Sequence, residues 1–268
     1  MSSAFDLGAY LARIALKSAP AADADGLAAV QLAHRLTIPF ENLDIRLGRG
    51  ISLDTAHLFD KIVHRRRGGY CFEQNALFLH ALEALGFDAR PLLARVWLFA
   101  EGVPPRTHML NLVRIGGEDW IADAGFGGGY APPMKLAEGS SATTADGGQF
   151  RLSRLDGHGW LLERKGDAGA GEWQRQYSFT LDPVFPVDLE MSNHWAATRP
   201  GTYFTTQSVV SICLPTGFAS LIDRRYNRRA GEQSVETDIE SAKAYRLRLN
   251  FVFGIVVDEV EVMGLALY

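Results

Sequence analysis

Cysteine is scarce in this sequence: Cys71 and Cys213 are the only two among 268 residues. Two thiols are too few for a disulfide framework in a chain of this size. Long apolar runs are missing too, and none approaches the roughly 20 residues that a membrane span needs. The N-terminal stretch lacks a basic start, and Asp6, Arg13 and Lys17 interrupt its apolar positions, unlike a secretory signal. These absences predict a cytoplasmic protein that contacts no membrane.

An excess of positive charge is also missing. The chain has 27 Lys and Arg against 31 Asp and Glu, a formal net charge of −4, and a sequence pI of about 6.0. Without a global positive field, nucleic acid is a disfavoured partner. Hydrophobic residues make up 47% and charged residues 22%, which excludes a disordered or fibrous chain. The length is sufficient to bury a sizeable core.

The first ninety residues show apolar positions at three- and four-residue spacing, which predicts a helical region. Asp54 is suited to cap one of these helices. The most informative helix should begin at 70–73, directly after Gly68 and Gly69. It should end at Gly86, a residue suited to a left-handed C-terminal cap.

From residue 90 the period of the apolar residues shifts towards two, which predicts a β region. Gly116 and Gly117, between two apolar runs, predict a tight hairpin turn. The segment 137–148 is rich in Gly, Ser and Thr and is interpreted as a surface loop. The expected strands cover residues 92–99, 108–115, 119–123, 149–155, 160–164 and 172–179.

After Pro186 the pattern is mixed. Helices are expected over 191–197 and 240–249, and a strand over 207–214, with further strand on either side of the second helix. The sequence shows no internal repeat and no long linker, so an α+β chain with closely packed parts is the simplest architecture. Its expected domains are a helical part over 1–88, a β part over 89–186 and a mixed part over 187–268.

Cys71 is the candidate nucleophile. It is expected in the first turn of a helix, behind two glycines and the arginine run 65–67. Unpaired N–H groups, the helix dipole and nearby guanidinium charge all favour thiolate, so the pKa of Cys71 is expected to be lowered. The same N–H groups can hold an oxyanion. A buried structural cysteine is the competing interpretation, and the double glycine favours the functional one.

A thiolate nucleophile needs a base, and that base needs an orienting partner. His108 begins a strongly apolar strand, where a buried imidazole requires a hydrogen-bond partner. If Gly116 and Gly117 form a two-residue turn, Asp123 lies diagonally across from His108, at roughly 7 to 8 Å, within reach of two side chains. The pairing also explains a carboxylate in an apolar context, where burial alone is costly.

Other features are less suited to chemistry. His34 is expected as a solvated or interfacial side chain. Cys213 has no electropositive neighbour in the sequence and is expected to be a buried packing residue. The glycine-rich segment 125–129 lacks the lysine of a phosphate-binding loop and is interpreted as a flexible loop beside Asp123. No spacing of His, Cys or carboxylates indicates a metal site.

Together the motifs resemble the arylamine N-acetyltransferase family, and the similarity runs from end to end. The segments that carry it are Ile38-Pro39-Phe40-Glu41-Asn42-Leu43, Arg67-Gly68-Gly69-Tyr70-Cys71-Phe72-Glu73-Gln74-Asn75, Thr107-His108 and Asp123-Ala124-Gly125-Phe126-Gly127. The resemblance implies an N-terminal helical domain, a central β-barrel and a C-terminal α/β lid around a cysteine-protease-like catalytic core. It also implies Cys71 as the acyl-accepting nucleophile, His108 as its base and Asp123 as the residue that orients His108.

Further roles follow from the same resemblance. Glu41 and Arg67 match a buried salt bridge that supports the cysteine loop. The short connection 131–148 is typical of bacterial members and implies a more open cofactor cleft. Acetyl-CoA is the implied donor, an arylamine or arylhydrazine the implied acceptor, and no metal or tightly bound cofactor is implied. The aromatic residues expected to bind the acceptor are Tyr70, Phe72, Phe126 and Phe204.

Two other interpretations remain open at this point. A thiol hydrolase of the papain or transglutaminase type uses the same residue types in the same order, and the triad alone does not distinguish it from a transferase. A non-catalytic module for aromatic ligands, with a structural Cys71, belongs to a different class. The flanking motifs favour the transferase, and the sequence makes no prediction of oligomeric state.

Overall fold

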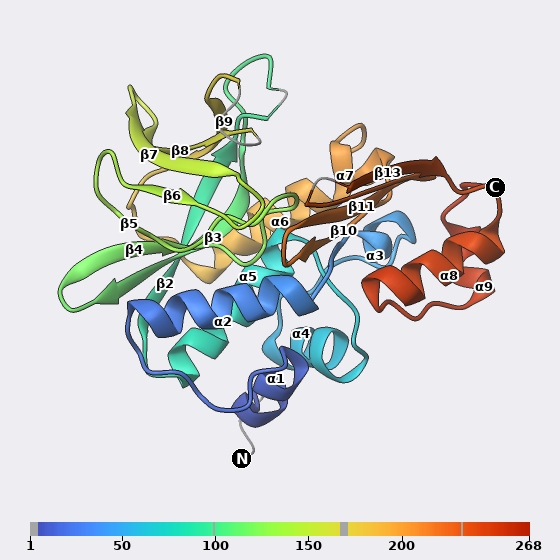
Figure 1. Cartoon of the computed structure of the whole chain (residues 1–268), viewed down its shortest axis with the longest axis horizontal. Helices are drawn as coiled ribbons and strands as arrows, with labels where there is room; N and C mark the ends of the chain where they lie inside the picture. Colours follow the sequence, from blue (N-terminus) through green and yellow to red (C-terminus); the bar gives the residue numbers. More distant parts are fainter. Residues whose placement is uncertain (1–4, 99, 167–170, 232) are drawn as a thin grey trace.

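The structure is a computed structural model that describes residues 5–98, 100–166, 171–231 and 233–268. Its N-terminal part is helical, as expected (Figure 1). Asp6, Asp23 and Asp54 accept hydrogen bonds from backbone N–H groups at the starts of three of these helices. The helical elements are α1 (Leu7–Arg13), α2 (Ala24–Thr37), α3 (Leu43–Arg46), α4 (Thr55–Phe59), the π-helical turn η1 (Asp60–His64) and α5 (Cys71–Ala84).

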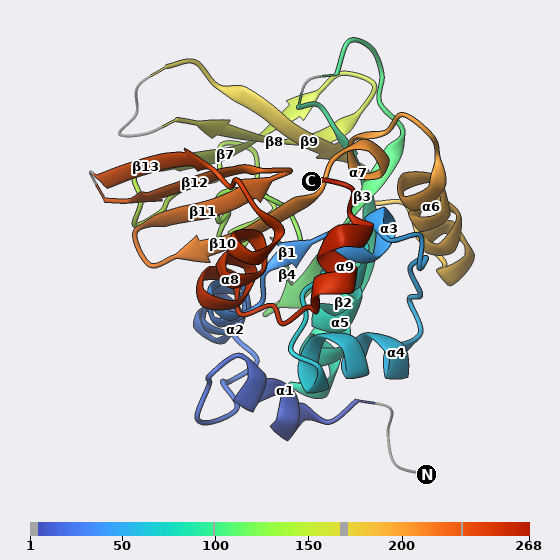
Figure 2. The same cartoon turned by 90° about the vertical axis from the view of Figure 1, so that its right-hand side faces the viewer.

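Helix α5 confirms the prediction for the segment after the two glycines. It begins at Cys71 and ends at Ala84, and Gly86 follows with a φ of +88°. Side chains from both ends of α5 are buried, so it is the central helix of the helical part. Figure 2 shows α5 beside β2, with α1 and α4 below it.

An eight-stranded antiparallel sheet follows and curls into a barrel-like shape (Figure 1). Gly116 and Gly117 have φ values of +59° and +85°, as a two-residue hairpin turn requires. Its strands are β2 (Asp88–Val96), β3 (Arg106–Ile115), β4 (Glu118–Ala122), β5 (Met134–Lys135), β6 (Ser141–Thr143), β7 (Gln149–Leu155), β8 (Gly159–Lys165) and β9 (Gln174–Phe179), in the order β5-β4-β3-β2-β9-β8-β7-β6.

The structure differs from two expectations for this region. The segment 137–148 is not wholly a loop, because β6 lies within it and pairs with β7. The strand expected over 92–99 ends at Val96, and Phe99 lies outside the described residues.

The C-terminal part is mixed, as expected. The elements are α6 (Pro186–Thr198), α7 (Tyr203–Thr206), β10 (Val209–Leu214), β11 (Gly217–Ile222), β12 (Arg225–Ala230), β13 (Gln233–Asp238), α8 (Ala242–Phe253) and α9 (Glu259–Gly264). The expectation of strand after the 240–249 helix is wrong. The side chain of Asp258 accepts from the N–H of Glu261, and this cap starts a helix in spite of the valines around it.

The parts are joined through shared structure. The short strand β1 (Phe40–Glu41) pairs with β10, so the N-terminal and C-terminal parts contribute to one five-stranded sheet. The largest hydrophobic core combines Phe72 and Leu77 of α5 with Met109 of β3 and Val209 of β10. The α+β fold class is confirmed, while the domain boundaries at 88 and 186 stay a prediction.

No helix among the described residues is both long and apolar enough to cross a membrane.

Candidate active site

Two glycines place Cys71 at the start of α5. A Cβ on Gly68 would stand 2.0 Å from the carbonyl oxygen of Pro39, and one on Gly69 would stand 2.7 Å from Cβ of Glu73. The glycines are therefore required for close approach of the backbone. The side chain of Glu73 accepts a hydrogen bond from the N–H of Tyr70 at 3.1 Å, which fixes the first turn of the helix.

The thiol of Cys71 is buried, with 4% of the residue exposed. Its Sγ lies 3.7 Å from the carbonyl oxygen of Thr107, the residue before His108. Burial raises the pKa of the Cys71 thiol and the carboxylate of Asp123 raises it further, although the N–H groups of Met109 and Phe72 lower it. The expectation of a lowered pKa for Cys71 is therefore wrong for the protein without bound substrate.

Of the arginine run 65–67 that was expected to assist the thiolate, Arg67 is directed elsewhere. Arg67 Nη2 lies 2.8 Å from Glu41 Oε1, and both side chains are buried. This is the salt bridge implied by the family resemblance. The positive charge of Arg67 is already matched by the carboxylate of Glu41, so it contributes little to the electrostatic potential at Cys71.

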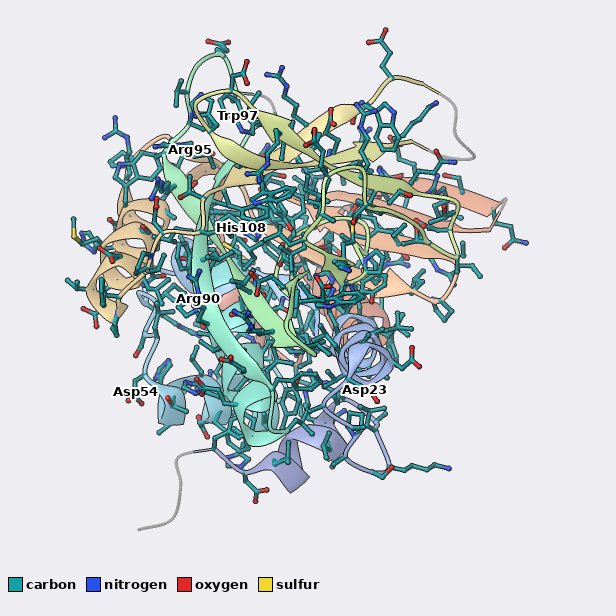
Figure 3. All side chains as sticks on the ribbon, turned by 90° about the vertical axis from the view of Figure 1, so that its left-hand side faces the viewer. Asp23, Asp54, Arg90, Arg95, Trp97 and His108 are labelled. Carbon is teal, nitrogen blue, oxygen red and sulfur yellow. The ribbon has the colours of Figure 1, made fainter. Side chains whose placement is uncertain are left out.

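The structure brings His108 and Asp123 together. Nε2 of His108 lies 2.7 Å from Oδ2 of Asp123. The register Ile115 to Glu118 across the hairpin is the one expected, and Asp123 follows the last residue of β4. Because Nε2 is used by the carboxylate, Nδ1 is the ring nitrogen that a second partner can reach. His108 lies among the side chains of the barrel strands in Figure 3.

The second carboxylate oxygen of Asp123 is also held. Its Oδ1 accepts from Asn75 Nδ2 and from the N–H groups of Gly125 and Phe126, each at 2.9 Å. Burial alone would raise the pKa of Asp123, but His108, Asn75 and Gly125 outweigh it and hold this pKa below its usual value. Asp123 is therefore a carboxylate that is fixed on both of its oxygens.

Asn75 is a site residue that the sequence reasoning did not assign. Besides Asp123, it donates to the carbonyl of Met109, and its Oδ1 accepts from the N–H of Ala124 at 2.9 Å. A signal was present, because Asn75 lies four residues after Cys71 and therefore on the same face of the helix. Asn75 connects the helix of the thiol to the strands of the His–Asp pair.

The glycine-rich segment is anchored at its start. A Cβ on Gly125 would stand 2.7 Å from the carbonyl oxygen of Cys71. Arg35 donates to the carbonyls of Ala124 at 3.3 Å and Gly128 at 2.9 Å. The segment 125–129 is therefore a loop beside Asp123, as expected, and it is anchored at Gly125 and Gly128, while its flexibility stays a prediction.

The structure corrects one expectation for Cys213 and one for His34. Cys213 is buried as expected, but Arg35 Nη2 lies 3.3 Å from its Sγ, so it does have an electropositive neighbour. His34 is fully buried, where it contacts the hydroxyl of Tyr10 at 2.8 Å and Oε1 of Gln74 at 3.0 Å. Burial lowers the pKa of His34 to about 3, so its imidazole is neutral at pH 7.

The four candidate aromatic residues differ in exposure. Tyr70 and Phe72 are fully buried, whereas Phe126 and Phe204 are half-buried. The ring of Phe126 lies 5.0 Å from that of His108, and the ring of Phe204 lies 5.6 Å from that of Tyr70. Phe126 and Phe204 therefore have ring surface available to a ligand. Tyr70 and Phe72 have none, because they are packed in the interior. Tyr177, which the sequence reasoning missed, also lies against His108, with ring centroids 4.9 Å apart.

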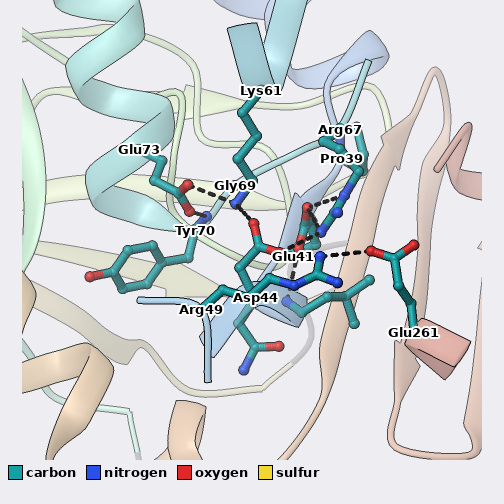
Figure 4. Close-up of polar contacts among 12 residues, drawn as sticks. Pro39, Glu41, Asp44, Arg49, Lys61, Arg67, Gly69, Tyr70, Glu73 and Glu261 are labelled. Carbon is teal, nitrogen blue, oxygen red and sulfur yellow. Dashed lines mark hydrogen bonds and ion pairs between the residues drawn. The ribbon is translucent and has the colours of Figure 1, made fainter. Parts of the chain in front are cut away.

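A buried network of charges supports the cysteine loop (Figure 4). Lys61 Nζ lies 2.6 Å from Asp44 and 2.8 Å from Glu73, the residue that also binds the N–H of Tyr70. Arg67 bridges Glu41 and Asp44. Burial alone would lower the pKa of Lys61, but the surrounding carboxylates raise this pKa by more, so Lys61 stays charged. Within the described ranges, no group of three or more His, Cys, Asp or Glu could hold a metal ion.

A thiol at a helix start, beside a buried His–Asp pair, is the arrangement of enzymes that move acyl groups through cysteine. A family model described as N-acetyltransferase matches residues 23–262. The arylamine N-acetyltransferase of Escherichia coli is 38% identical over 262 residues, which cover 95% of this chain and 90% of that protein. The chain belongs to the arylamine N-acetyltransferase family, whose members are acetyl-CoA-dependent acyltransferases.

Solved structures agree with this assignment. The arylamine N-acetyltransferase from Salmonella typhimurium is similar over the whole of both chains, with a TM-score of 0.91 and 33% identity. The Mycobacterium marinum enzyme, solved in complex with CoA, has a TM-score of 0.88 and 30% identity, and covers 97% of this chain and 98% of that one. The interpretation as a non-catalytic ligand-binding module is therefore set aside.

Proposed function

We propose that the protein transfers an acetyl group from acetyl-CoA to the nitrogen of an arylamine or arylhydrazine, through an acetyl-cysteine on Cys71. The observation that carries this proposal is the position of the Cys71 thiol against Thr107 and Met109, on either side of His108, whose Nε2 is bound by Asp123. The names of the relatives support the two substrates.

In the first half-reaction, His108 Nδ1 takes the proton of the Cys71 thiol as the sulfur attacks the thioester carbonyl. The carbon–sulfur bond to CoA then breaks, and the CoA thiolate receives the proton from the imidazolium. Because burial raises the pKa of Cys71, the thiolate forms together with the imidazolium. Asp123 holds the imidazole in the required tautomer and stabilises its charged form.

In the second half-reaction, the acceptor nitrogen attacks the acetyl-cysteine carbonyl. His108 accepts the proton that the nitrogen loses. The bond between the acetyl carbon and Sγ then breaks, and the imidazolium gives its proton to the sulfur, which restores the Cys71 thiol. Arylamines are weakly basic and uncharged at neutral pH, so modest base assistance is sufficient. The half-buried rings of Phe126 and Phe204 offer apolar surface to an aromatic acceptor.

The alternative is a thiol hydrolase, which hands the acyl group to water. Mass spectrometry of the intact protein after mixing with acetyl-CoA separates the two. We expect one acetyl group on Cys71, discharged much faster by an arylamine than by buffer. The Cys213→Ala variant should still accept one acetyl group and Cys71→Ala none. Equal discharge by water and amine would favour the hydrolase, and an acetylated Cys71→Ala variant would remove Cys71 from the mechanism.

A further inference from the structure

A cavity of about 130 Å³ lies at one end of the barrel-like sheet, and none of the three proposed catalytic residues lines it. Figure 3 shows Arg95 and Trp97 towards one end of the sheet, above His108 and Arg90. The lining residues are Arg95, Arg106, Gly157, His158, Ser178, Phe179 and Thr180.

Two arginines from neighbouring strands line this cavity side by side. Arg95 of β2 is the direct cross-strand partner of Arg106 of β3, beside a β-bulge that leaves Thr107 of β3 without a partner in the register. Like charges directly opposite each other destabilise a sheet. Burial and the charge of Arg106 both lower the pKa of Arg95. Bulges at barrel rims commonly redirect side chains for a purpose.

The fold compensates this pair only in part. Arg95 Nη1 donates to the carbonyl of Pro104 at 2.6 Å, a neutral acceptor. Arg106 Nη2 lies 3.7 Å from Asp182 Oδ2, and that carboxylate is 65% exposed and also accepts from the hydroxyl of Thr180. An exposed ion pair of this length is weak. Positive charge therefore remains directed at the cavity.

The rest of the lining adds hydrogen-bond donors. Ser178 is buried, and its hydroxyl oxygen accepts from Trp97 Nε1 at 2.9 Å, which leaves its own proton to donate. His158 stands in the turn between β7 and β8, and its ring packs edge-on against Trp97 at 5.1 Å. Trp97 thus fixes two donor side chains beside the arginine pair.

We propose that this cavity binds a tetrahedral oxyanion, specifically a phosphate group held between Arg95 and Arg106. Guanidinium groups bind phosphate through paired charge-assisted hydrogen bonds, and a bound dianion would relieve their mutual repulsion. Free inorganic phosphate and the phosphate monoester of CoA share this chemistry. The site is independent of the role proposed for Cys71.

Calorimetric titration with inorganic phosphate, at constant ionic strength and with chloride as the control anion, tests the proposal. We expect saturable binding at one site. Arg95→Gln and Arg106→Gln should each weaken it about 10- to 100-fold, the loss of one charged hydrogen-bond partner. Arg90→Gln is the matched control, because Arg90 lies on the same strand but binds the carbonyl of Leu181 outside the cavity. It should leave phosphate binding unchanged.

A gain-of-affinity variant keeps the test independent of folding defects. Asp182→Asn removes the carboxylate that competes for Arg106, so phosphate binding should tighten about two- to fivefold. No saturable phosphate binding, or equal affinities in wild type and both Gln variants, would overturn the proposal.

Binding of CoA and of dephospho-CoA identifies the source of the phosphate. If the monoester of CoA occupies the cavity, CoA should bind at least tenfold more tightly than dephospho-CoA, and Arg106→Gln should abolish that ratio. If the two bind equally while inorganic phosphate still binds, a free oxyanion is the ligand. Both results support the site, and failure of acetyl transfer through Cys71 affects neither.

Discussion

His108 and Asp123 are 15 residues apart in sequence, and Nε2 of one lies 2.7 Å from Oδ2 of the other. Both side chains are almost completely buried, at 1% and 3% exposure. A buried carboxylate of this kind is stable only when its charge is matched and its lone pairs are used. The pair therefore fixes both the tautomer and the orientation of the imidazole.

Replacing Asp123 by Asn should retain the shape of the site and reverse its hydrogen bonding. The amide group can donate to Nε2, which places the remaining ring proton on Nδ1, the nitrogen that must accept from Cys71. We expect the rate of Cys71 acetylation to fall by about 10³- to 10⁴-fold. Rapid-quench mass spectrometry with acetyl-CoA measures this rate, and circular dichroism checks the fold. A decrease below tenfold would show that orientation of His108 by Asp123 is unimportant.

The reactivity of Cys71 should depend on His108. Burial and Asp123 raise the pKa of the thiol, so a thiolate at neutral pH requires the imidazole to take the proton. In the Cys213→Ala background, where Cys71 is the only thiol, His108→Phe should slow alkylation by iodoacetamide at pH 7 at least about 100-fold. The rate should recover only well above the ordinary thiol pKa of about 8.5, because burial and Asp123 still raise the pKa of Cys71 in this variant. Similar alkylation rates at pH 7 for Cys213→Ala with and without His108→Phe would contradict this dependence.

Close packing of the glycine-rich segment gives a steric prediction. A methyl group at Gly125 would stand 2.6 Å from Asn75 Nδ2 and 2.7 Å from the Cys71 carbonyl oxygen, whereas one at Gly129 would meet its nearest atom at 3.5 Å. Gly125→Ala should therefore displace Asn75 and lower kcat/KM for acetyl transfer by about 10²-fold, the effect of a small misplacement at a reacting centre. Gly129→Ala is the control and should retain activity. Equal activity of the two variants would argue against the packing described.

Local patterns predicted the part of the site that depends on local geometry. The Gly116-Gly117 turn fixes the register of β3 and β4, so the approach of His108 and Asp123 follows from the sequence. The start of α5 at Cys71 follows from the two preceding glycines. The helix α9 was mistaken for strand because valines favour strands, while a single cap at Asp258 decided the outcome.

Long-range contacts outside the family motifs could not be predicted from the sequence. Arg35 binds carbonyls 89 and 93 residues away, and no local pattern indicates that pairing. The raised pKa of Cys71 arises from burial by the whole fold, which outweighs the local effect of a helix start. The pairing of Arg67 with Glu41, 26 residues earlier, was predicted only through the family resemblance, because proximity in sequence alone assigns the arginine charge to the thiol.

The buried network of Lys61 should be important for stability. Lys61→Met removes the cation that pairs with Glu73 in a nearly dry environment, and leaves Asp44 with only its longer contacts to Arg67 and Arg49. We expect a loss of about 3–5 kcal/mol in the free energy of unfolding, as for other broken buried pairs. Urea denaturation measures it, and Lys135→Met, which breaks the exposed pair with Glu118, should cost at most about 1 kcal/mol. Similar losses in the two variants would show that burial of the network is not decisive.

The same network predicts an acid sensitivity of the fold. Burial would raise the pKa of Asp44, but Lys61 and Arg67 outweigh it and lower this pKa from 3.8 to about 2. Since the folded-state pKa lies below the unfolded one, Asp44 stabilises the fold above pH 4, and its contribution is lost as the pH falls from about 4 to about 2. The shift corresponds to about 2 kcal/mol, of which about half should be lost by pH 3.

Urea denaturation at pH 5 and pH 3 checks this contribution. The decrease in unfolding free energy between the two pH values should be smaller by about 1 kcal/mol in Asp44→Asn than in the wild type, because the amide does not titrate. Asp44→Asn is also expected to be less stable at pH 5, since Lys61 and Arg67 lose a charged partner. Glu118→Gln changes an exposed carboxylate that is not part of the network, and it should keep the wild-type pH dependence. If Asp44→Asn also keeps the wild-type pH dependence, the pKa of Asp44 does not differ between the folded and the unfolded chain.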